Sequence, residues 1–67
     1  MKYTINNVTK GKKVLEIETS DAEAAAGEYI SLLMIAGLVK KDLRDIVFSG
    51  DNFSIVSKGW NFEVVSI

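Results

Sequence analysis

The acid–base side chains available for catalysis in this chain are carboxylates, because the sequence contains no histidine and no cysteine. Histidine performs most proton transfer near neutral pH, and nucleophilic catalysis commonly uses cysteine or a serine paired with histidine. The closest acidic groups are Glu16 with Glu18, and Asp42, Asp45 and Asp51. We interpret the first pair as a solvated strand face. The three aspartates lack the regular alternation of a calcium-binding loop, and we expect Asp42 to cap or solvate a turn.

A phosphate-binding loop would need several glycines close together in one segment. The five glycines are instead scattered, at Gly11, Gly27, Gly37, Gly50 and Gly59. We interpret them as residues that shape turns and helix ends. The sequence therefore predicts a protein that is not an enzyme, with no catalytic residue, no metal site and no cofactor.

Lysines on two predicted turns are the candidate contacts with nucleic acid, namely Lys10, Lys12 and Lys13 on one turn and Lys58 on the other. Tyr3, Phe53 and Trp60 carry rings that stack on bases in such proteins, but the strand pattern places these rings on the core face. The formal net charge of −1 also predicts no long-range attraction to nucleic acid or to an acidic membrane. Nucleic-acid binding is therefore a secondary hypothesis.

Alternation of apolar and polar residues predicts a β-hairpin at the start of the chain. Residues 2–6 and 13–19 have the two-residue period of half-buried strands. Gly11, between them, supplies the positive φ that a tight connection needs. Val8 falls out of phase with the first strand, which predicts a β-bulge at residues 6–7.

A helix is predicted over residues 21–36. Ser20 and Glu23 have the spacing of a capping box, in which the serine hydroxyl accepts from a first-turn N–H and the glutamate reaches back. Gly37 is a plausible left-handed stop. The lysines that follow it suit the negative end of the helix dipole.

The pattern of the residues after Gly37 predicts a short helical turn and a strand, and then a second hairpin or a three-stranded meander. Gly50 and Asp51 have the form of a two-residue hairpin loop, and Gly59 repeats the turn signal. Runs of strands on both sides of one helix favour an antiparallel layer. We therefore expect one α+β domain over residues 1–67. Its main helix packs on an antiparallel sheet of four or five strands, in the order ββαββ or ββαβββ.

The predicted core joins one sheet face to one helix stripe. The sheet face comprises Tyr3, Ile5, Leu15, Ile17, Phe53, Ile55, Trp60, Phe62 and Val64. The helix stripe recurs at steps of three and four residues and comprises Ala22, Ala25, Ala26, Tyr29, Ile30, Leu33 and Ala36.

The second side of the helix is also largely apolar or small, and a helix that is apolar all round is normally buried all round. One helix on one sheet has nothing of its own to cover that side, so we predict an interface. Its residues are Ala24, Gly27, Glu28, Ser31, Leu32, Met34, Ile35 and Leu38. Glu28 should point to solvent or meet a cation, because burying it unpaired would be costly.

Closed twofold assemblies are the commonest oligomers, so we expect a homodimer, with a foreign protein target as the second interpretation. Alternatively, the segment after Gly37 folds back over this side of the helix. A domain of this size buries only about 60% of its unfolded surface, and without cysteine or histidine self-association is the remaining route to extra stability.

We therefore expect a small non-catalytic protein-interaction module, a regulator or inhibitor that self-associates. A nucleic-acid-binding protein and a structural subunit of a larger assembly are the alternatives. Residues 1–9 lack the pattern of a secretory signal. The apolar run at residues 29–39 is shorter than the roughly 20 residues of a membrane helix. We accordingly expect a cytoplasmic protein that binds no membrane.

Overall fold

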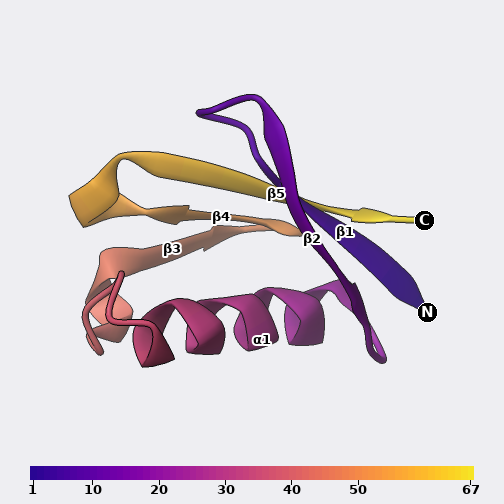
Figure 1. The fold of residues 1–67 in the computed structure, drawn as a ribbon, viewed down its shortest axis with the longest axis horizontal. Coiled ribbons are helices and arrows are strands. Elements are labelled where there is room, and N and C mark those ends of the chain that lie inside the picture. The colour runs from indigo at the N-terminus through magenta and orange to yellow at the C-terminus, as the bar shows by residue number, and fades with distance from the viewer.

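One helix lies along one face of a five-stranded antiparallel sheet in the computed structural model, which describes all residues 1–67 (Figure 1). The order along the chain is ββαβββ, the longer of the two predicted orders. The elements are β1 (Lys2–Asn7), β2 (Lys12–Glu18), α1 (Ala22–Ile35), the 3₁₀ turn η1 (Leu43–Asp45), β3 (Ile46–Ser49), β4 (Asn52–Ile55), the 3₁₀ turn η2 (Val56–Lys58) and β5 (Trp60–Ser66).

The last strand of the chain is the central strand of the sheet. The order across the sheet is β2-β1-β5-β4-β3, so β5 pairs with β1 on one side and with β4 on the other. Figure 1 shows the strong twist that results, with β1 and β2 crossing the direction of β3, β4 and β5. The two open edges of the sheet are therefore β2 and β3.

The N-terminal hairpin contains a β-bulge, but on the strand opposite to the predicted one. Ile5 pairs with Leu15 and Asn6 pairs with Lys13, so Val14 on β2 is the extra residue. The ladder therefore shifts register where the bulge was predicted, beside Asn6, but the extra residue is on β2. The reason is that β1 pairs on both sides, with β2 and β5. A bulge in β1 would disturb two ladders, whereas a bulge in the edge strand β2 disturbs one.

Helix α1 begins after Asp21, whose backbone is extended and whose carboxylate accepts the backbone N–H of Ala24 at 2.8 Å. The cap predicted at Ser20 is therefore wrong by one residue. A charged carboxylate is a stronger acceptor than a hydroxyl, and its charge suits the positive end of the helix dipole.

The helix ends in a Schellman motif at the predicted glycine. Gly37 has a φ of +75°. Its N–H donates to the carbonyl of Met34 at 3.1 Å, and the N–H of Leu38 donates to the carbonyl of Leu33 at 3.0 Å. These two bonds satisfy carbonyls that the last helical turn leaves unpaired.

Strands β3, β4 and β5 form the predicted meander. Ser49 pairs with Asn52 across the two-residue loop of Gly50 and Asp51. Gly50 has a φ of +62°, and no residue other than glycine has a positive φ. This combination defines a type II′ turn, whose twist matches that of the strands. Gly59, with a φ of +66°, closes η2 before β5.

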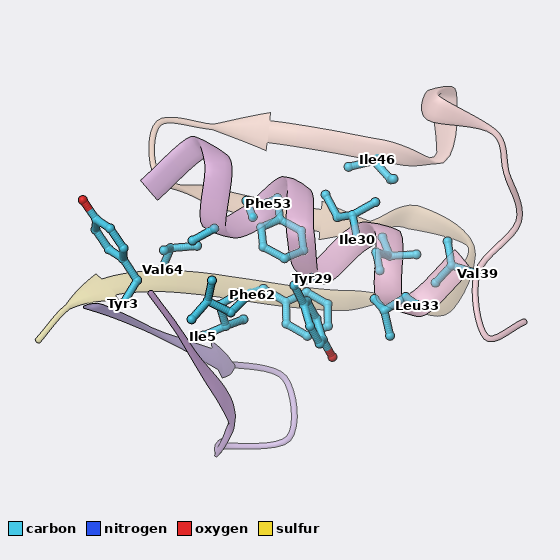
Figure 2. Close-up of a cluster of buried hydrophobic side chains, with 14 residues drawn as sticks. Tyr3, Ile5, Tyr29, Ile30, Leu33, Val39, Ile46, Phe53, Phe62 and Val64 are labelled. Atoms are coloured by element: carbon cyan, nitrogen blue, oxygen red, sulfur yellow. The ribbon is translucent and has the colours of Figure 1, made fainter. Parts of the chain in front are cut away.

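The core lies between α1 and one face of the sheet (Figure 2). Tyr29 from α1 meets the ring of Phe62 edge-on, with centroids 5.3 Å apart. Fourteen buried apolar residues form a single cluster: Tyr3, Ile5, Ile17, Ala25, Ala26, Tyr29, Ile30, Leu33, Val39, Ile46, Phe53, Ile55, Phe62 and Val64.

Most of the predicted core is confirmed, with differences at its margins. Leu15 and Trp60 are only half-buried, because they pack against the rim of the cluster. Ala36 is exposed, because it is the residue at which the helix ends. Val39 and Ile46 join the core from the segment after the helix.

The opposite face of the sheet is polar. Asn6 donates its side-chain N–H to Glu63 at 3.0 Å, and the hydroxyl of Ser54 donates to the side-chain oxygen of Asn61 at 2.7 Å. Each pair bridges two neighbouring strands. An antiparallel sheet with one core face and one polar face has this arrangement.

Candidate interaction surface

The side of α1 that faces away from the sheet is exposed and partly apolar. We call Gly27, Glu28, Ser31, Leu32 and Ile35 the outward face of α1, because all five are exposed. The exposed fraction is 52% for Leu32 and 80% for Ile35. Leu38, just beyond the helix, is also 52% exposed. Large apolar side chains gathered on one exposed face are typical of contact sites.

The outward face lies opposite the buried stripe on the helix, and this follows from helical geometry. With 3.6 residues per turn, Glu28 and Ile35 lie about half a turn from the buried Ala26 and Leu33. Six of the eight predicted interface residues are therefore exposed. The other two, Ala24 and Met34, are half-buried, and Met34 packs against the core cluster.

The segment after Gly37 does not cover the outward face. Val39 turns back into the core, whereas Leu32, Ile35 and Leu38 keep at least half of their surface exposed. The alternative that this segment folds over the helix is therefore wrong. Val39 instead joins the core cluster, at the end of it where Leu33 lies (Figure 2).

A shallow hollow separates the outward face from the edge strand β2. Gly27 is one of its lining residues, and no atom lies within 4 Å of the position that a Cβ would take there. Glu28 is exposed, as predicted, and takes part in no ion pair of the protomer. The hollow is lined by Ile17, Gly27, Glu28, Ser31 and Leu32.

The predicted lysine contacts divide into two groups. Lys10 and Lys58 converge on one ring, since their Nζ atoms lie 5.4 and 5.8 Å from the centroid of Trp60. A hydrogen bond from the hydroxyl of Thr9 to the carbonyl of Gly59, at 3.4 Å, links the two turns. These contacts are cation–π interactions. The sequence does not reveal this convergence, because the two lysines belong to different hairpins.

Lys12 and Lys13 lie apart from Trp60, on the edge strand β2. Lys13 forms an ion pair with Glu16. The hydrogen bond from Lys13 and its positive charge lower the pKa of Glu16. This pair, together with the exposed Glu18, forms the solvated strand face that the sequence predicts.

The three aspartates have separate structural roles. Asp42 caps η1 by accepting the backbone N–H of Arg44 at 3.0 Å, and it also pairs with the Arg44 guanidinium. These bonds lower the pKa of Asp42. Asp45 accepts the backbone N–H of Ser57 at 2.7 Å as well as its hydroxyl, and so ties η1 to η2. Asp51 lies in the β3–β4 turn. No group of acidic residues in the chain has the arrangement of a metal site.

No protein family, curated protein or solved structure matches this chain. Its surfaces therefore provide the basis for assigning a function. None of its helices combines the length and the apolar character needed to cross a lipid bilayer. The exposed apolar side chains of α1 are the feature of this surface that most resembles a protein contact site.

Proposed function

We propose that this protein is a non-catalytic interaction module that self-associates through the outward face of α1. One observation carries the proposal: Leu32 and Ile35 on α1, and Leu38 just beyond it, stay at least half exposed. Fully burying an apolar side chain of this size contributes roughly 1.5–3 kcal/mol. Burying the exposed part of these three side chains would therefore favour association.

The sizes of the side chains favour an antiparallel pairing of two helices. With Ser31 at the twofold axis, Gly27 lies across from Ile35 of the second copy. A small residue then faces a large one at each end of the contact, which lets the two helices approach to the usual 8–10 Å.

Ile35→Asp tests the apolar contact, because a carboxylate cannot be buried there without a large desolvation cost. Sedimentation should show a wild-type dimer and an Ile35→Asp monomer. Val8→Asp is the matched control: it changes an exposed apolar residue in the β1–β2 turn, and it should remain a dimer. A wild-type protein that sediments as a monomer at high micromolar concentration would refute self-association.

Gly27→Leu tests the close approach of the helices. A Cβ at this position meets no atom within 4 Å, and leucine favours the helix more than glycine does. The protomer should therefore become more stable while the dimer is lost. A Gly27→Leu protein that still dimerises as tightly as wild type would exclude the antiparallel pairing about Ser31.

The convergence of Lys10 and Lys58 on Trp60 supports nucleic-acid binding as a second candidate function. Neither lysine forms an ion pair in the protomer, so both charges are available to phosphate. A gel-shift assay with a single-stranded oligonucleotide tests this candidate. Binding should weaken steeply with salt and should be lost in Lys10→Gln/Lys58→Gln, while Lys12→Gln has a smaller effect. Absence of binding at low salt would exclude it.

A further inference from the structure

The two open edges of the sheet differ in how well they are protected. Strand β2 carries two lysines, two glutamates and the bulge at Val14. Charges and bulges on an edge strand prevent it from pairing with another strand. Strand β3 has the sequence Ile-Val-Phe-Ser, with no charge, no proline and no bulge. The β3 edge is therefore the unprotected one.

The backbone of β3 has unpaired groups at Phe48. Ser49 and Asn52 close the two-residue hairpin as a hydrogen-bonded pair, and such pairs alternate along an antiparallel ladder. Val47 therefore bonds to Ser54, while the N–H and C=O of Phe48 point away from β4. An added strand would find one donor and one acceptor in the correct geometry there.

A cleft lies between this edge and the first turns of α1, and the side chain of Phe48 forms one wall. Phe48 is 53% exposed although it lies on the core face of the sheet. A residue placed opposite Phe48 on an added strand would point to the same face, and hence into this cleft. The cleft is lined by Ala22, Glu23, Ala26, Phe48, Gly50 and Asp51.

The charge of the cleft indicates the kind of side chain that fits it. Glu23 and Asp51 contribute two carboxylates, and neither belongs to either of the chain's two ion pairs. An aromatic ring beside two carboxylates suits a cation, which gains both a cation–π contact and charge-assisted hydrogen bonds. Lysine and arginine also have apolar stems that cover an exposed ring.

We propose that the β3 edge binds an extended segment of a partner protein by strand addition, with a lysine or arginine opposite Phe48. The backbone of the segment pairs with the N–H and C=O of Phe48. The cationic head meets Glu23 and Asp51. This site goes beyond self-association through α1, because it uses the β3 edge of the sheet.

A second copy of the chain fits this edge less well than a cationic segment. Pairing two β3 strands symmetrically about Phe48 would set Asp45 of one copy opposite Asp51 of the other. Like charges directly opposite each other destabilise a strand pair. No cation of the second copy would then lie opposite Phe48.

The probe is the peptide acetyl-Thr-Val-Thr-Arg-Thr-Val-Thr-amide, titrated into the ¹⁵N-labelled full chain. Its arginine and valines share one face and can point into the cleft. We expect amide shifts centred on Phe48. The same peptide with glutamate in place of arginine should bind at least about tenfold more weakly. A peptide N-methylated at arginine loses the donor to the Phe48 carbonyl and should not bind.

Charge reversal in the protein provides the matched test. Glu23→Lys/Asp51→Lys should reverse the preference, so that the glutamate peptide binds more tightly than the arginine peptide. Glu16→Lys/Glu18→Lys, the same change on the β2 edge, should leave the preference unaltered. Circular dichroism establishes that both variants are folded, and the comparison of the two peptides on one protein is independent of small losses of stability.

Four results would overturn the proposal: no shift at Phe48 with millimolar peptide, shifts on β2 instead, equal affinity for the two charged peptides, or undiminished binding of the N-methylated peptide. Phe48 amide shifts that depend on protein concentration alone would identify a second copy as the occupant and also overturn it. Repeating the titration with Ile35→Asp separates the two proposals. Peptide binding should persist in that variant whether or not the wild-type protein dimerises through α1.

Discussion

The rings of Phe53 and Phe62 stack across the β4–β5 pair, with centroids 4.8 Å apart and planes inclined by 14°. Both side chains are almost fully buried. Tyr29 closes the group from α1, with its ring centroid 6.3 Å from that of Phe53. The central strand β5 thereby connects the meander to the helix. In this group of rings, side chains from β4, β5 and α1 pack against one another.

Phe62→Ala should remove most or all of the stability of the domain. Truncation of a buried phenylalanine costs about 3–5 kcal/mol, and a chain of this length has a free energy of unfolding of roughly 3–10 kcal/mol. Phe48→Ala is the control, because Phe48 is half exposed at the β3 edge, and it should cost less than about 1.5 kcal/mol. Urea denaturation followed by circular dichroism measures both. Equal losses of stability for the two variants would contradict the burial of Phe62 in the core.

Asp21→Ala should destabilise the protein by about 1 kcal/mol, because it removes the acceptor for the N–H of Ala24. Ser20→Ala should change the free energy of unfolding by less than about 0.5 kcal/mol, as is usual for surface substitutions. The two variants differ by one position, so chemical denaturation of both distinguishes the observed cap from the predicted one. A larger loss of stability for Ser20→Ala than for Asp21→Ala would show that Ser20 caps the helix, as the predicted capping box requires.

Substitution by alanine should have opposite effects on stability at Gly27, within α1, and at Gly37, just beyond the end of the helix. Gly37 has a φ of +75°, and an alanine in the left-handed conformation costs about 1–2 kcal/mol. Gly27 lies in the helix with open space around it, and alanine there should stabilise the protomer by about 0.5–1 kcal/mol. Both variants are best measured in the Ile35→Asp background, where association makes no contribution. Destabilisation by Gly27→Ala would show that the helix is not regular at that point.

Arg44→Gln should raise the pKa of Asp42 towards its ordinary value of 3.8, because the hydrogen bond from Arg44 is the main cause of the lowered pKa. A lowered pKa in the folded state means that the stabilising effect is fully present above pH 3.8 and is lost as the pH falls through the lowered value. NMR titration of the Asp42 carboxyl measures the change directly. Glu16 is the internal control, since its partner is Lys13, and its pKa should not move.

The local sequence was enough to predict the helix, its buried stripe and the two hairpin turns, and it left the number of strands at four or five. Strand alternation, the glycine turns and the spacing of apolar residues in α1 depend on neighbours only a few residues away. Those same spacings placed Ile35 opposite the buried stripe. Small choices between adjacent candidates, such as Asp21 over Ser20, were not decided by the pattern, because both residues are good caps.

The tertiary structure decided how the strands are ordered and which surfaces result. Strand β5 could have joined the sheet beside β4 alone, but it also pairs with β1, and this brings the two ends of the chain together. That one pairing makes β1 and β5 inner strands and sets Lys10 over the same indole as Lys58. The bulge at Val14 accordingly lies on the edge strand β2. Contacts of this kind join residues far apart in the chain. They depend on the packing of the whole core, which no local spacing specifies.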